Sequence, residues 1–201
     1  MEKKKMKKVL LFLSQGFEAY EASVFTDVLG WSREVGLDAI DLVTTGLRPE
    51  FTCCWNLIVK SEVEFDTIKA DDFDALAIPG GEPTAGFFDD AYDERFLSLI
   101  REFDKQGKII ASICVAALAI GKSGVLHNRQ ATTWDLNEGK RRTELANFGA
   151  LVQDKHIVVD KNIITSTGPA TSIDVAFKLV EMLTDIHNVT EIKKTMRFIT
   201  V

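Results

Sequence analysis

The sequence predicts an α/β fold in which helices cover both faces of a mostly parallel β-sheet. Three observations lead to this prediction. Short apolar runs recur at residues 9–13, 40–46 and 74–81, as expected for strands buried on both faces. Apolar residues at helical spacing occupy the intervening stretches 19–35 and 94–106. The two patterns alternate along the chain, which favours parallel strands joined by crossover helices.

The remaining elements follow from local composition. A loop at residues 14–18 joins the first strand to the first helix, which we expect Gly36 to end. Residues 52–61 indicate a more exposed strand or hairpin that contains Cys53 and Cys54. Towards the carboxyl end we expect a short strand at 131–134, a β-hairpin over 156–166 that turns at 160–162, and a helix over 173–183. With no repeat or linker, the prediction is one domain over residues 1–201.

Charge and composition exclude several classes of protein. A net charge of −6 and a pI near 5.2 argue against a nucleic-acid partner, which needs a concentrated positive face. The only basic cluster, at residues 3–8, precedes an apolar run too short for a signal peptide or a membrane span, so we expect a cytoplasmic protein without a membrane partner. Three cysteines without C-x-x-C spacing fit free thiols in a reducing compartment.

The stretch 108–124 carries the main candidate nucleophile. It predicts a strand, a sharp turn at Cys114 and a buried helix. A side chain at such a turn points outwards near the first N–H groups of the helix, which predicts a lowered pKa for the thiol. The alternative is that Cys114 only fills the core, because cysteine is among the most buried residues and the glycines of a nucleophile elbow are replaced by Ser112 and Ala116.

Two further signals follow predicted strands at their carboxyl ends. Glu18 follows the first strand, and Gly80 and Gly81 follow the strand at 74–81. Such ends meet at one edge of a parallel sheet, so these residues are expected near Cys114. A carboxyl group there would hold its proton and donate it in a hydrogen bond to sulfur. The glycines would offer N–H groups to an oxyanion. The alternatives are an acidic residue in the first turn of a helix, and a plain turn.

These motifs together resemble the DJ-1/PfpI (ThiJ) superfamily. The similarity lies in Gly16-Phe17-Glu18, Pro79-Gly80-Gly81, the elbow Ala111 to Cys114, and Thr165 to Thr171, in that order over nearly the whole chain. The resemblance implies a flavodoxin-like sandwich that forms a homodimer, with the Cys53 and Cys54 region near the dimer contact. It also implies Cys114 as the reactive cysteine, Glu18 as its protonated partner, and N–H groups of Gly81 and Val115 lining the pocket.

Two positions depart from the family pattern. Val115 stands where relatives with hydrolytic activity often carry histidine, directly after the cysteine. Trp134 stands where members of the DJ-1 branch carry histidine. We interpret His127, His156 and His187 as surface residues, so a Cys–His dyad and peptidase activity are not expected. Trp134 either walls the pocket or belongs to the core. No metal ligand set and no G-x-G-x-x-G motif are present, so neither a metal nor another cofactor is predicted.

The resulting hypothesis is a Cys–Glu site that acts on a small-molecule substrate. A soft nucleophile and an acid suffice for addition to a reactive carbonyl, as in glyoxalase- or deglycase-like members, or for hydration of an isonitrile. The alternative is a redox or stress sensor in which Cys114 is oxidised to a sulfinic acid. A third interpretation is a scaffold that keeps the pocket without turnover.

Overall fold

A six-stranded sheet organises the structure, a computed structural model that describes residues 6–35, 37–136 and 138–200. The strand order is β2-β1-β5-β6-β10-β9. All neighbouring strands run parallel except β9, which pairs antiparallel with β10. This confirms the predicted mostly parallel sheet. The roles predicted for Gly36 and for the first basic residues lie outside the described residues.

The elements follow one another with short connections. The strands are β1 (Lys7–Phe12), β2 (Ile40–Thr45), β3 (Glu50–Thr52), β4 (Ile58–Lys60), β5 (Ala75–Ile78), β6 (Ile109–Ser112), β7 (Gln130–Ala131), β8 (Leu151–Val152), β9 (Ile157–Asp160) and β10 (Ile163–Ser166). The α-helices are α1 (Ala19–Val35), α2 (Phe87–Ala91), α3 (Glu94–Lys105), α4 (Ala117–Lys122), α5 (Lys140–Asn147), α6 (Ser172–Leu183) and α7 (Ile186–Thr195).

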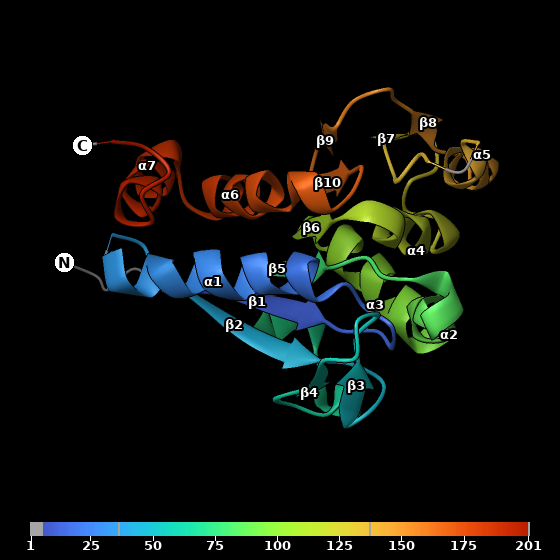
Figure 1. Cartoon of the computed structure of the whole chain (residues 1–201), viewed down its shortest axis with the longest axis horizontal. Helices are drawn as coiled ribbons and strands as arrows, with labels where there is room; N and C mark the ends of the chain where they lie inside the picture. Colours follow the sequence, from blue (N-terminus) through green and yellow to red (C-terminus); the bar gives the residue numbers. More distant parts are fainter. Residues whose placement is uncertain (1–5, 36, 137, 201) are drawn as a thin grey trace.

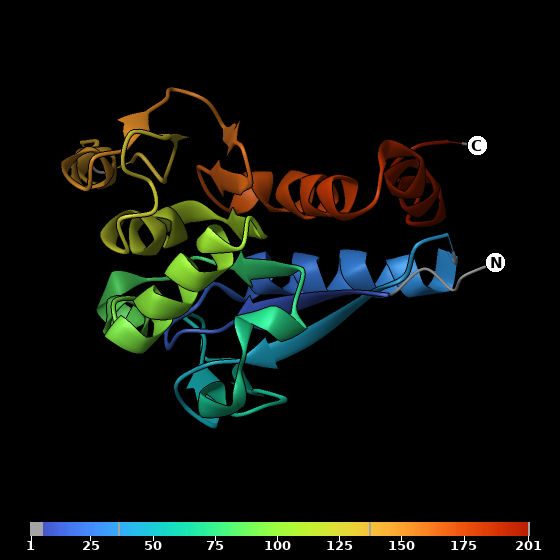
Figure 2. The ribbon, with the colours of Figure 1, turned by 180° about the vertical axis from the view of Figure 1, so that it is seen from behind.

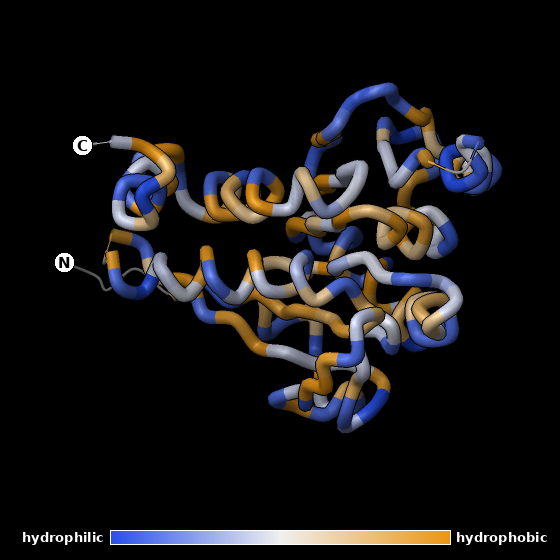
Figure 3. Tube along the Cα trace, in the orientation of Figure 1, coloured by the Kyte–Doolittle hydropathy of each residue, from blue (hydrophilic) through white to orange (hydrophobic). Residues whose placement is uncertain are grey.

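Helices cover both faces of the sheet. Helices α1 and α6 lie across the face seen in Figure 1, and α3 covers the opposite face, seen in Figure 2. Apolar residues follow the strands, whereas α5 and the loops around it are largely hydrophilic (Figure 3). Burial of the strands on both faces explains their continuous apolar runs, since neither side of the pleat meets water.

Aromatic packing joins the sheet to its helices. Phe12 of β1 stacks on Phe96 of α3 with ring centroids 3.5 Å apart, and both side chains are fully buried. Phe25 of α1 is fully buried on the other face. Burial of such side chains contributes roughly 1.5–3 kcal/mol each to folding, so the core fixes the edge at which the strands end.

Most predicted elements are confirmed, including α1 at its predicted bounds and the hairpin of β9 and β10. The predicted strand at 131–134 is wrong beyond Ala131. The Thr132 N–H donates to the Thr165 side chain (2.9 Å) instead of a neighbouring backbone, so the ladder stops there. Helices α2, α5 and α7 were not predicted. Helix α5 is strongly polar and buries only Leu145, so its sequence lacks the regular spacing of apolar residues that indicates a helix. Within the described residues, no helix combines the length and apolarity that a membrane span requires.

Candidate functional site

Cys114 stands on a strained turn between β6 and the helix that follows. The Ile113 N–H still bonds the Ile78 carbonyl (3.1 Å), and Cys114 then adopts φ +58° before a short 3₁₀ turn leads into α4. A positive φ is unfavourable for a residue with a Cβ, so surrounding contacts must hold it. The Thr133 hydroxyl provides one, donating to the Cys114 carbonyl oxygen at 2.9 Å. The geometry is that of a nucleophile elbow without its usual glycines.

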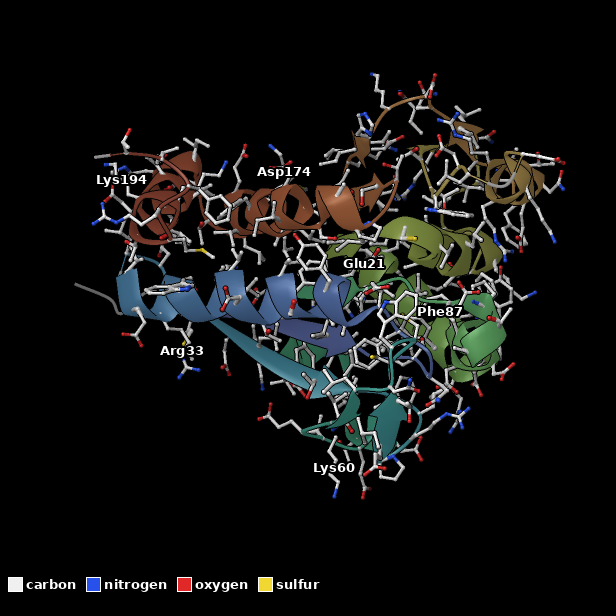
Figure 4. All side chains as sticks on the ribbon, in the orientation of Figure 1. Glu21, Arg33, Lys60, Phe87, Asp174 and Lys194 are labelled. Carbon is white, nitrogen blue, oxygen red and sulfur yellow. The ribbon has the colours of Figure 1, made fainter. Side chains whose placement is uncertain are left out.

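The carboxyl group beside Cys114 belongs to Glu21, in the first turn of α1. Its side chain is fully buried, its Oε2 accepts the Gly80 N–H at 2.6 Å, and the carboxyl interacts with the Cys114 thiol. A Cβ at Gly80 would lie 2.7 Å from Cys114 Cβ and 2.8 Å from Glu21 Oε2. Only glycine therefore lets the cysteine and the carboxyl approach this closely. Figure 4 shows Glu21 at the end of α1 that faces the elbow.

Burial controls the protonation of this pair. It raises the pKa of Glu21 from 4.5 to about 8, which the hydrogen bond from Gly80 partly opposes. Burial also raises the pKa of the Cys114 thiol, as does the negative charge of Glu21, while the Val115 N–H acts in the opposite direction. The lowered thiol pKa expected from the sequence is therefore wrong in direction: removing the sulfur from water outweighs the nearby N–H group. At neutral pH most Glu21 carboxyls carry a proton.

Glu18 lies in the same pocket but has other partners. Its carboxylate accepts hydrogen bonds from Trp55 Nε1, at 3.1 Å and 3.0 Å to its two oxygens, and from Cys54 Sγ at 3.2 Å. Burial, followed by this contact with Glu18, raises the pKa of Cys54 to about 12. The Glu18 charge also acts on Cys114 and Glu21, though more weakly than burial does. The carboxyl in contact with Cys114 is thus that of Glu21, three residues further along.

A pocket of about 450 Å³ opens above Cys114. It is lined by Glu18, Glu21, Cys54, Trp55, Gly81, Glu82, Pro83, Thr84, Cys114, Val115, Trp134, Arg141 and Pro169. Of the residues predicted for the site, Gly81, Val115 and Trp134 line it, and the half-buried Trp134 forms part of its wall. Gly80 lies behind it, because its N–H is bound to Glu21 and its carbonyl accepts the Glu18 N–H (2.8 Å).

Sequence reasoning missed Glu21, although a signal was present. Glu21 falls at i, with Val24, Phe25 and Val28 at i+3, i+4 and i+7, so it shares the apolar face of α1. A carboxyl group on the buried face of a helix is costly unless it is protonated or paired. That placement marks a candidate functional residue more strongly than the position of Glu18 in the preceding loop.

The other titratable candidates lie away from the pocket. His127, His156 and His187 are all exposed, as predicted, and none lines it. Cys53 is buried and accepts backbone N–H groups of Trp55 (3.3 Å) and Leu57 (3.2 Å). Among residues 6–35, 37–136 and 138–200, no group of three or more His, Cys, Asp or Glu side chains is arranged to hold a metal ion.

Comparisons with known proteins identify the family of this chain. The sequence profile described as the DJ-1/PfpI family matches residues 7–182. The protein named dj-1beta of Drosophila melanogaster is 30% identical over 192 residues, which span 94% of this chain and 95% of that protein. The crystal structure of Drosophila melanogaster DJ-1beta superposes on this chain with a TM-score of 0.84 at 26% identity. The match covers 98% of this chain and 100% of that one. The protein named Deglycase PfpI of Pyrococcus furiosus is 31% identical over 111 residues, 55% of this chain and 63% of that protein.

Proposed function

Because the chain belongs to the DJ-1/PfpI family, we propose that it converts a small reactive carbonyl compound or a related electrophile through Cys114. The observation that carries this proposal is the fully buried Glu21 carboxyl beside the Cys114 side chain at the floor of an open pocket. A carboxyl group with a pKa near 8 exchanges its proton close to neutral pH, which suits an acid–base catalyst. The relative named as a deglycase supports the same chemistry.

The residues divide the first step between them. Ionised Glu21 takes the thiol proton as Cys114 sulfur bonds to the carbonyl carbon, and the C=O π electrons move to oxygen. In this proposal the N–H groups of Gly81 and Val115, two residues that line the pocket, hold the resulting oxyanion. Glu21 then returns the proton to that oxygen, giving a neutral hemithioacetal. Every atom of thiol and carbonyl is retained, and no oxidant or reductant is required.

The family motifs favour Glu18 as the acid, and parallel variants separate the two carboxyls. We propose Glu21 as the acid–base residue and Glu18 as a charged residue of the pocket wall. Exposed histidines outside the pocket leave Cys114 without an imidazole base, which argues against peptide hydrolysis. A sensor role is less well supported, because the raised pKa of Cys114 leaves little thiolate for peroxide at neutral pH.

The experiment is a turnover assay with a panel of α-oxoaldehydes and isonitriles. The wild-type protein is expected to consume at least one compound, and Cys114→Ala and Glu21→Gln are each expected to lower the rate by about 100-fold or more. Cys53→Ser is the matched control, since this buried thiol lies outside the pocket lining. Absence of any Cys114-dependent turnover across the panel would overturn the proposal.

We also propose that two copies of the chain associate as a homodimer. The hairpin of β3 and β4 leaves Leu57 and Ile58 more than half exposed, in the region that the family resemblance places near a dimer contact. Large exposed apolar side chains in one patch are typical of interaction surfaces. Sedimentation velocity is expected to show a dimer that Ile58→Lys weakens, whereas Val159→Lys, on β9, leaves it unchanged; a monomer at all concentrations contradicts the proposal.

A further inference from the structure

The charged groups around the pocket are unevenly paired. Glu18 and Glu82 line it, and within the part of the chain that the structure describes neither forms an ion pair with a lysine or arginine. Glu82 is exposed, and among the described residues its side chain accepts only from Thr84, through the Thr84 N–H (3.2 Å) and hydroxyl (3.1 Å). Two carboxylates therefore face the pocket with their charge uncompensated.

The cation that lines the pocket is already neutralised. Arg141 Nη1 lies 2.7 Å from Glu144 Oε2, and its guanidinium stacks over the Phe88 ring at 5.0 Å. The second oxygen of Glu144 accepts the Tyr92 hydroxyl at 2.8 Å. The charge of Arg141 is thus paired with Glu144, and one face of its guanidinium is covered by Phe88. Arg141 therefore offers little attraction to an anionic ligand.

The remaining walls favour a positive charge. Trp55 is 73% exposed, and its indole is fixed by the two hydrogen bonds to Glu18. Trp134 supplies a second indole to the lining. Aromatic faces attract ammonium groups, and adjacent carboxylates add to that attraction.

An unsatisfied oxygen at the floor marks a point at which a ligand can form a hydrogen bond. Glu21 is fully buried and lines the pocket, and its Oε1 has no hydrogen-bond partner among the described residues. A buried polar atom without a partner is unfavourable unless a bound molecule satisfies it. A polar group near the reactive carbon of a substrate would do so, as an acceptor while Glu21 holds its proton and as a donor once Glu21 is ionised.

We propose that this pocket selects electrophiles that carry a positive charge, such as small carbonyl compounds with an ammonium group close to the reactive carbon, and disfavours anionic ones. The inference rests on the proposed role of Cys114 as the nucleophile. The carboxylates of Glu18 and Glu82, with the indole of Trp55, receive the cation, while the carbonyl reaches Cys114 beneath them. Selection by charge at the pocket is a property separate from turnover, and it can be measured without a substrate.

The test uses methanethiosulfonate reagents that differ only in charge, one ending in a trimethylammonium group and one in a sulfonate. In each reaction the thiolate forms a disulfide with the reagent and methanesulfinate leaves, so the chemistry is constant. Mass spectrometry follows the Cys114 peptide in a Cys54→Ser background. The ratio of cationic to anionic rate constants is expected to exceed that of 2-mercaptoethanol by about fivefold or more at ionic strengths near 0.02 M, and to shrink near 0.5 M.

Two variants and a control identify the source of the selectivity. Glu18→Gln and Glu82→Gln are each expected to lower the ratio by about twofold or more, and the double variant further. Glu102→Gln removes the same charge from an exposed position on α3 outside the lining, and is expected to leave the ratio unchanged. A wild-type ratio equal to or below that of the free thiol, or one that these variants do not alter, overturns the proposal.

A second measurement keeps the inference testable if Cys114 reacts with neither reagent, a result that would count against the proposed function. Quenching of tryptophan fluorescence by caesium and by iodide is compared in a Trp31→Phe background, where Trp55 and Trp134 remain. Caesium is expected to quench better relative to iodide than it does with a free tryptophan amide, and Glu18→Gln should reduce that preference. Equal relative quenching in protein and free amide would refute a negative pocket.

Discussion

The floor and the mouth of the pocket each pair a cysteine with a glutamate, yet they are built for different tasks. At the floor, Cys114 and Glu21 are buried together, and burial sets their protonation. At the mouth, Cys54 and Glu18 lie beside the exposed Trp55, and the carboxylate takes hydrogen bonds from both neighbours. The same two functional groups thus form a buried pair that we propose as nucleophile and acid–base residue in one place, and a hydrogen-bonded pair beside an exposed indole in the other. The environment, rather than the residue type, assigns the role.

The largest expected difference between the two carboxyls concerns stability against pH. Because the pKa of Glu21 is about 8 in the folded protein and 4.5 ordinarily, the folded protein holds a proton that the unfolded chain has released between these values. This contribution is fully present below pH 4.5 and is lost as the pH rises through 8. The free energy of unfolding of the wild-type protein is therefore expected to fall by on the order of 3–5 kcal/mol as the pH rises over this range. Glu21→Gln is expected to remove this fall.

Urea denaturation between pH 4 and pH 9 measures this decline. Glu18→Gln is the matched variant and should keep the wild-type slope, because it leaves the buried Glu21 carboxyl in place. If the unfolding free energies of wild type and Glu21→Gln change in parallel over the whole pH range, the pKa of Glu21 is not raised in the folded protein.

A second prediction concerns the pH profile of Cys114 alkylation by iodoacetamide. The wild-type rate should rise through pH 8 and then level, since Glu21 accepts the thiol proton once it is ionised. Glu21→Gln should give a rate about tenfold lower at pH 8 and no levelling there, because burial raises the pKa of the thiol itself. Rates are read by mass spectrometry of the Cys114 peptide, with Glu18→Gln expected to retain the inflection. Loss of the inflection in Glu18→Gln alone would exchange the roles of the two carboxyls.

A third prediction tests how the floor is held. Thr133→Val removes the hydroxyl that donates to the Cys114 carbonyl and should cost about 1–2 kcal/mol of unfolding free energy. Thr132→Val is the neighbouring control, because the Thr132 hydroxyl is buried without a partner among the described residues, and its loss should be neutral or stabilising. Thermal denaturation of both variants decides between these outcomes; equal destabilisation would show that the Cys114 carbonyl does not depend on Thr133.

The smallest effect is expected at the mouth. Trp55→Phe removes the indole donor to Glu18 and should change the alkylation rate of Cys54 by about two- to threefold, with the rate of Cys114 changed less. Trp31→Phe, on the exposed side of α1, controls for loss of a tryptophan. Peptide mapping after a short iodoacetamide pulse reports both thiols together. Equal changes at both thiols would show that floor and mouth act as one unit.

The sequence predicted the fold and the turn on which Cys114 stands because each depends on local pattern. Apolar runs mark strands buried on both faces, and Cys114 stands where one such run meets a helix. The raised pKa of that thiol depends on how much water the surrounding layers exclude, which no local pattern records. Glu21 was missed because its burial comes from the packing of α1 on the sheet, although its place on the apolar face of that helix was visible.

The positive φ of Cys114 also bears on how this protein would change under selection. A non-glycine residue held in that region costs on the order of 1–3 kcal/mol, and the buried carboxyl of Glu21 adds a further cost above neutral pH. The fold therefore gives up stability at the two residues on which its chemistry would depend. Lineages selected only for heat resistance at alkaline pH should lose Glu21 before they lose residues of the core, and a directed-evolution experiment without an activity screen would reveal that order.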